Sequence, residues 1–181
     1  MLNKTETVAD AGNRARNVVR NGIADVYPRL WRYCIVLTGS RDLADDLAQA
    51  VCLKAIEKAD LFQEGTHLDR WMMRIAQRDW INDLRKQAVR RGAGLAPVEE
   101  IDLLDEKPNP ESNILIREVL SSVMTLPEAQ RATVVLAYVE GYSYKECAEI
   151  LEIPIGTVMS RLAAARAKLA GKFNSNESSA T

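Results

Sequence analysis

The chain has 181 residues, which suits one domain or two small ones, and 47% of them are hydrophobic, as in a globular protein. Its 24 basic residues nearly balance 25 acidic ones, so any basic surface for a nucleic acid must be local. The start of the chain lacks the apolar segment of a signal peptide, and no apolar run approaches the roughly 20 residues of a membrane-spanning helix. We therefore expect a cytoplasmic protein without membrane insertion.

The cysteines do not form a pattern for metal binding. Cys34, Cys52 and Cys147 lack CxxC spacing, and His67 is the only histidine. No paired catalytic residues and no phosphate-binding loop are evident either. We expect buried free thiols, no metal or cofactor, and no enzymatic activity.

The first domain is expected at 13–91. Apolar residues repeat at helical steps from Val19 to Leu37, and Pro28 interrupts them. We expect one helix that ends near Val26 and a second that begins at Pro28, where a missing N–H does no harm.

The next helix is expected at 42–59, with Asp42 as its N-cap. Asp42, Asp45, Asp46 and Gln49 form a polar, acidic outer face near its N-terminus. Such a face stabilises the helix dipole and adds solubility. It can also be a surface for docking another protein, and the residues alone leave both interpretations open.

A glycine-containing break, LFQEGTH, precedes a helix expected at 68–91. Arg70, Arg74, Arg78 and Arg85 lie four, four and seven residues apart, so they share one helical face. Basic residues beside Trp71 and Trp80 are typical of a surface that follows a nucleic-acid backbone and stacks bases. The alternative is a solvated charged face with the tryptophans in the core.

Residues 92–112 contain three prolines, two glycines and an acidic run, which predicts a linker. A second helical domain is then expected at 113–172. Its helices are predicted at 113–124, from Leu126 to a stop at Gly141, from a capping box at Ser143 and Glu146, and from Ile155 to about Gly171. With no strand pattern anywhere, the fold class is all-α, with two small domains.

The last two helices have the spacing of a helix-turn-helix. Val158, Leu162, Ala165 and Leu169 form one apolar stripe at steps of four, three and four. The other face carries small and weakly polar side chains that can enter a DNA groove closely. The spacing alone fits an ordinary helical hairpin equally well.

These segments resemble the extracytoplasmic-function (ECF, group IV) sigma factors of bacterial RNA polymerase. The resemblance is strongest from Leu126 to Leu169, in the LPEAQR opening, the SYKECAE helix and the GTVMSRL helix, which match sigma region 4. The first domain matches sigma region 2 through DLADDLAQ, 42–49, and through the run from Trp71 to Arg85. The resemblance covers most of residues 20–170.

The resemblance implies a function and its site residues. Region 2 would contact the β′ clamp helices of core RNA polymerase through Asp42, Asp45, Asp46 and Gln49. It would bind the separated −10 promoter element through the loop before the helix expected at 68–91 and through His67, Arg70, Arg74, Arg78, Trp80, Asn82 and Arg85, with one base flipped into a protein pocket. Region 4 would bind the −35 element in the major groove through Thr157, Met159, Ser160, Arg161, Ala163, Ala164 and Arg166, and would meet the β flap. Control by an anti-sigma factor is also implied.

Met159 and Ala164 stand where the family often has basic residues, although both can contact thymine methyl groups. Their presence motivates an alternative: a sigma-like adaptor that sequesters an anti-sigma factor without binding DNA. The four arginines of 70–85 argue against the adaptor. A stand-alone helix-turn-helix repressor is a third interpretation, and the DLADDLAQ helix argues against it.

Overall fold

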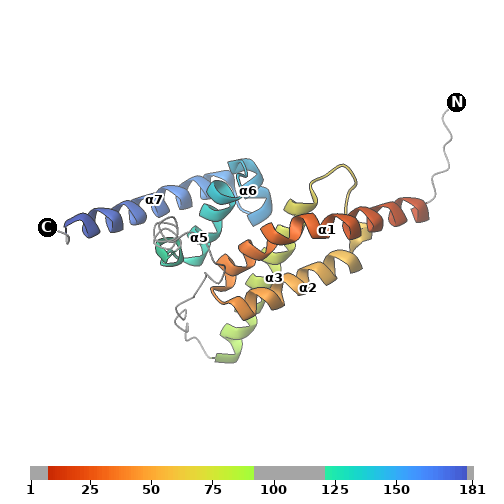
Figure 1. Cartoon of the computed structure of the whole chain (residues 1–181), viewed down its shortest axis with the longest axis horizontal. Helices are drawn as coiled ribbons and strands as arrows, with labels where there is room; N and C mark the ends of the chain where they lie inside the picture. The colour runs from red at the N-terminus through yellow and green to blue at the C-terminus, as the bar shows by residue number, and fades with distance from the viewer. Residues whose placement is uncertain (1–7, 92–120, 179–181) are drawn as a thin grey trace, which may run out of the picture.

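The computed structural model describes residues 8–91 and 121–178, and every regular element within them is helical (Figure 1). In chain order these are α1 (Val8–Thr38), α2 (Arg41–Glu57), the one-turn helix η1 (Ala59–Leu61), α3 (Leu68–Arg91), α5 (Glu128–Val134), the π-helical turn η2 (Val135–Val139), α6 (Tyr144–Leu151) and α7 (Ile155–Ser178). Residues 121–124 are helical as well. The expected all-α fold is confirmed for this part of the chain.

Helices α1, α2 and α3 pack around one apolar core and form the first domain. Leu30 of α1, Val51 of α2 and Met72 of α3 have no exposed surface. A buried polar pair joins α1 to α3, because the Tyr33 hydroxyl donates a hydrogen bond to Oε1 of Gln77 at 2.6 Å. A buried hydroxyl without a partner costs about 1–3 kcal/mol, so this pair fixes how α3 lies on α1.

Helices α5, α6 and α7 form the second domain. The apolar stripe predicted for α7 is confirmed: Val158, Leu162 and Ala165 are fully buried, and Leu169 is half-buried against the same core. Leu136 and Ile150 complete that core from η2 and α6. Met159, Ser160, Ala163, Ala164 and Arg166, which lie between the stripe positions, are exposed on α7.

The turns around α6 follow the predicted chemistry. Gly141 ends the preceding helix with φ 76°, a conformation that glycine adopts without strain. The capping box is present, with the Ser143 hydroxyl accepting from the Glu146 backbone N–H and the Glu146 carboxylate accepting from the Ser143 backbone N–H. Helix α6 ends at Glu152, whose φ of 55° is left-handed, and Pro154 precedes α7.

Two details of the first domain differ from the prediction. Pro28 does not separate two helices, because α1 continues through it. Pro28 and Ala24 are both exposed, so water can reach the carbonyl of Ala24, which lacks its usual helical donor, while Leu30 stays buried against the core. Asp42 is not the N-cap of α2: the chain turns at Gly39, Ser40 is the extended N-cap residue, and Asp42 lies in the first turn.

The expected linker at 92–112 and most of the helix expected at 113–124 lie outside the described residues. The domain boundaries therefore stay predictions. Within the described residues, no helix is long and apolar enough to cross a bilayer.

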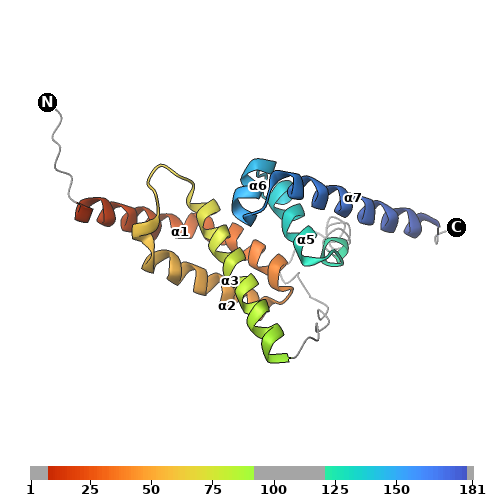
Figure 2. The same cartoon turned by 180° about the vertical axis from the view of Figure 1, so that it is seen from behind.

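The two domains pack directly against each other, α5 on α1 and α6 on α3 (Figures 1 and 2). At their contact the Glu140 side chain is only 1% exposed and accepts hydrogen bonds from Arg29 at 2.8 Å and Arg32 at 3.1 Å. Arg29 also donates to Asp69 at 2.8 Å, and the same carboxylate accepts from the Tyr142 hydroxyl at 2.6 Å. We call these five residues the seam cluster.

A second contact joins α5 to the end of α1. Arg131 is 3% exposed, and its Nη2 donates to the backbone carbonyl of Leu37 at 3.2 Å. Leu37 lies in the last turn of α1, where carbonyls lack helical partners and a cation is favourable. Burial lowers the pKa of Arg131, and the nearby Glu128 carboxylate opposes that shift.

The uninterrupted α1 leads to a stability prediction. Pro28→Ala should raise the free energy of unfolding by about 1–3 kcal/mol, because alanine supplies the missing N–H and removes the ring clash inside a helix. Urea denaturation followed by circular dichroism measures the change.

Pro154→Ala is the matched control. Pro154 stands before the first residue of α7, where no helical N–H is needed. Alanine there should not raise the free energy of unfolding. It can lower it by about 0.4–1 kcal/mol, because the unfolded chain becomes more flexible. A loss of stability in Pro28→Ala equal to that in Pro154→Ala would contradict a continuous α1.

Candidate nucleic-acid interface

The four arginines expected on one face of α3 fall into three surroundings. Arg70 meets α6 of the second domain, with Nη1 3.2 Å from Glu146 and 3.8 Å from Glu149. Arg78 forms a two-bond ion pair with Glu152, including Nε to Oε2 at 2.7 Å. Arg74 and Arg85 make no ion pair within the residues that the structure describes.

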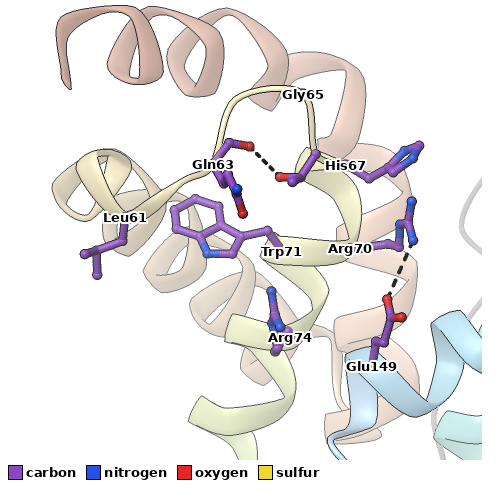
Figure 3. Close-up of a pocket in the computed structure, with 9 residues that line it drawn as sticks. Leu61, Gln63, Gly65, His67, Arg70, Trp71, Arg74 and Glu149 are labelled. Carbon is purple, nitrogen blue, oxygen red and sulfur yellow. Dashed lines mark hydrogen bonds and ion pairs between the residues drawn. The ribbon is translucent and has the colours of Figure 1, made fainter. Parts of the chain in front are cut away.

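Arg70 and Arg74 line a pocket of about 390 Å³ between the loop 61–67 and the start of α3 (Figure 3). The remaining lining residues are Leu61, Gln63, Gly65, Thr66, His67, Trp71 and Glu149. The loop is held in shape by the Thr66 hydroxyl, which donates to the backbone carbonyl of Gln63 at 2.6 Å.

The pocket combines an aromatic wall with cationic and polar groups. Trp71 packs on Phe62 with ring centroids 5.3 Å apart and keeps part of its surface at the pocket. Figure 3 shows Arg70 pointing toward α6, where Glu149 lies, while Trp71 and Arg74 stand under the loop. A flipped base can stack on an indole, accept hydrogen bonds from guanidinium groups and bring a phosphate to them.

The other residues expected at the −10 element lie elsewhere. Trp80, Asn82 and Arg85 line a groove of about 670 Å³ between α2 and α3, together with Asp46. Trp80 is 9% exposed, so its ring belongs to the core and offers no open face for stacking. Its Nε1 is buried and has no hydrogen-bond partner among the described residues.

The polar face of α2 divides into exposed and internal groups. Asp42, Asp46 and Gln49 are exposed. Asp45 instead accepts a hydrogen bond from Nε1 of Trp31 at 2.6 Å, which ties α2 to α1. Three of the four residues are thus free to contact a partner, and the fourth has a role inside the domain.

The outer face of α7 is open to solvent. Met159 is 54% exposed, and Ser160, Ala163, Ala164 and Arg166 are exposed as well. The absence of large side chains at two of these positions lets a groove approach the helix backbone closely.

Two residues expected at the −35 element differ from that exposed set. Thr157 is half-buried, with its backbone N–H bonded to the Pro154 carbonyl and its own carbonyl accepting from Ser160 Oγ. Arg161 is also half-buried and faces α5, since its charge acts on Glu128. Burial raises the pKa of Glu128, while Arg131 and Arg161 oppose that rise.

Some residues at these sites were not predicted from the sequence. Gln63 and Thr66 lie in the loop before α3, and the only sequence signal for them is the glycine and the polar composition of that loop.

Tyr138 is exposed and lies beside α6 and α7. A hydrogen bond with Tyr144 raises the pKa of Tyr138, and the charge of Arg166 opposes the rise. Glu149 enters the pocket from another domain, and nothing in local spacing indicates that contact.

Comparison with known proteins agrees with this arrangement. Residues 23–90 match the family described as Sigma-70 region 2, and residues 116–169 match Sigma-70, region 4. The ECF RNA polymerase sigma factor EcfG of Rhodopseudomonas palustris is 32% identical over 151 residues, 83% of this chain and 82% of that protein. The ECF sigma factor SigW of Bacillus subtilis is 28% identical, with 77% and 81% covered.

A solved structure, the sigma factor RpoE in complex with the anti-sigma factor NepR from Bartonella quintana, matches with a TM-score of 0.67 and 26% identity. The match covers 86% of this chain and 96% of that one. The paired region 2 and region 4 matches, with a relative at 32% identity over most of both chains, show that this protein belongs to the ECF family of RNA polymerase sigma factors.

Proposed function

We propose that the chain is a cytoplasmic, group IV sigma factor that binds core RNA polymerase, reads both promoter elements and is held inactive by an anti-sigma factor. One observation carries this proposal: a single chain holds a pocket with arginines and an indole on α3 and an α7 whose outer face is exposed. A sigma factor is a transcription initiation factor and needs no catalytic group or cofactor.

The −10 element is assigned to the pocket beside α3. His67, Arg70, Trp71 and Arg74 all line it, so a flipped non-template base has both a stacking surface and hydrogen-bond donors. Arg78 lies on the same helix and is exposed apart from its ion pair, so it can follow the DNA backbone once that pair opens.

The −35 element is assigned to α7. Met159, Ser160, Ala163 and Ala164 supply a close-fitting face for the major groove, and Arg166 supplies positive charge near it. Met159 and the alanines favour contacts with thymine methyl groups over contacts with guanine.

Core polymerase binding is assigned to α2. Asp42, Asp46 and Gln49 are exposed on one side of the helix, and exposed Leu43 and Leu53 lie on the same helix. A surface with exposed acidic and apolar side chains fits a protein partner better than DNA, because DNA is also negatively charged.

Control by an anti-sigma factor is supported by the likeness to the Bartonella sigma factor, which was solved in such a complex. The sigma-like adaptor remains a second candidate because Met159 and Ala164 leave two positions on the outer face of α7 uncharged. Run-off transcription with bacterial core polymerase and the promoter of a co-regulated gene separates the two. Promoter-dependent transcripts are expected, whereas binding of an anti-sigma factor without transcripts would support the adaptor.

Arg74→Ala tests the −10 pocket. Arg74 makes no ion pair in the described part of the chain, so its loss should leave the fold intact. We expect about a tenfold loss in open-complex formation, as for one guanidinium contact to DNA, with unchanged affinity for core polymerase. Permanganate footprinting and a core-binding titration measure the two quantities.

Arg20→Ala is a suitable control, because this exposed arginine of α1 lies outside both sites. Equal losses of DNA opening and core affinity in Arg74→Ala would mean that Arg74 is structural and would count against the pocket.

Asp46→Ala tests the polymerase surface. Removing an exposed carboxylate from an interface should weaken core binding by roughly tenfold, while thermal unfolding stays unchanged. The control is Asp25→Ala, which removes an exposed aspartate on α1 instead of α2. This variant should bind core polymerase as the wild type does. Identical core affinity for Asp46→Ala and Asp25→Ala would remove Asp46 from the interface.

A further inference from the structure

Helix α6 and the residue that ends it place three carboxylates against α3. Glu146, Glu149 and Glu152 are spaced by three, so they lie on neighbouring positions of one side of the helix. That side faces α3, where the first two meet Arg70 and the third meets Arg78.

These carboxylates pair with the guanidinium groups of Arg70 and Arg78, which are the groups that would bind promoter DNA. Glu149 is part of the wall of the −10 pocket, so a nucleotide entering it would bring its phosphate toward a negative charge (Figure 3). The hydrogen bond from Arg78 lowers the pKa of Glu152, and hydrogen bonds from Ser143 lower the pKa of Glu146. Both groups therefore stay charged at neutral pH, and the guanidinium donors that face them are already in use.

Different contacts hold the domains in this position. The pair between Arg78 and Glu152 is exposed, at 61% and 41% of the two side chains, and exposed pairs contribute little to stability. Glu140 of the seam cluster is almost fully buried between two arginines, so removing its charge affects the docking far more. The seam cluster fixes the docking, and the docking sets Glu149 in the wall of the pocket and Glu152 on Arg78.

We propose that α6 acts as an internal competitor of DNA: in the free chain its carboxylates take the place of promoter phosphates at the −10 arginines, and domain separation is needed before single-stranded DNA can bind. This inference rests on the proposed function of the pocket. Only the open fraction of molecules binds DNA, so the apparent dissociation constant exceeds the intrinsic one by the inverse of that fraction.

The test uses the full chain and a fluorescent 15-nucleotide oligothymidylate, which supplies phosphates and stackable bases without a promoter sequence. Glu149→Gln with Glu152→Gln removes two charges and keeps side-chain size. We expect this variant to bind the probe about three- to tenfold more tightly than the wild type. The matched control, Asp25→Asn with Glu57→Gln, removes two exposed charges that do not line the pocket and should stay within about twofold.

Two further variants locate the effect. Adding Arg74→Ala to the glutamine pair should abolish the gain, because the bound DNA then loses a pocket contact. Glu140→Gln should open the seam, seen as a larger radius of gyration in small-angle X-ray scattering, and should also bind the probe more tightly. Circular dichroism checks that each variant is folded.

Two results would overturn the competition. One is equal probe affinity for the wild type and the Glu149→Gln, Glu152→Gln variant. The other is a Glu140→Gln chain that opens without binding DNA more tightly. Run-off transcription by the wild-type chain is a separate readout, since absence of transcripts would count against the proposed function whatever the probe affinities are.

Discussion

The arrangement of the two domains depends on one buried carboxylate. Glu140 lies at the end of η2, where almost no water reaches it, and an unpaired charge there would be very costly. Burial alone would lower the pKa of Arg29, but the hydrogen bond to Glu140 and the nearby charges raise it, so the arginine stays charged beside the carboxylate. Arg29 also lies over the ring of Tyr142, 5.0 Å from its centroid, which adds a cation–π contact.

This constraint links the geometry of the domain contact to the proposed DNA site. Asp69 is shared: it accepts from Arg29 and Tyr142 at the seam, and it immediately precedes Arg70 of the pocket. The first turn of α3 therefore has one side in the seam cluster and the other at the −10 pocket. A partner that moves the second domain changes the surroundings of Arg70 without touching the pocket loop.

Local patterns predicted the helices well because their causes are local. The capping box at Ser143, the stop at Gly141 and the stripe through Val158 and Leu162 depend on neighbours within one or two turns. Pro28 does not end α1 as its residue type predicts, because tertiary packing along the rest of α1 outweighs one missing hydrogen bond. Side-chain preference favours Asp42 as the N-cap, but the turn at Gly39 makes Ser40 the extended N-cap residue.

The candidate site was predictable only in part. The basic spacing on α3 identified Arg70, Arg74 and Arg78, and the resemblance gave them a role. Periodicity cannot show that Glu149 completes the pocket or that Glu152 pairs with Arg78, since these contacts join residues more than 70 positions apart. It also cannot distinguish Asp45, bonded to Trp31, from its exposed neighbours on the same helix.

The left-handed backbone of Glu152 has a consequence for how α3 and α7 influence each other. Glycine would relax at φ 55°, yet glycine there would have no carboxylate for Arg78. Glu152, the strained residue between α6 and α7, is thus also the residue whose ion pair forms only when α3 is packed against α6. By thermodynamic reciprocity, whatever separates Glu152 from Arg78 alters the stability of that turn, and whatever fixes the turn on a major groove alters the strength of the ion pair. The ion pair between Glu152 and Arg78 therefore couples the turn before α7 to α3, the two helices to which we assign the promoter elements.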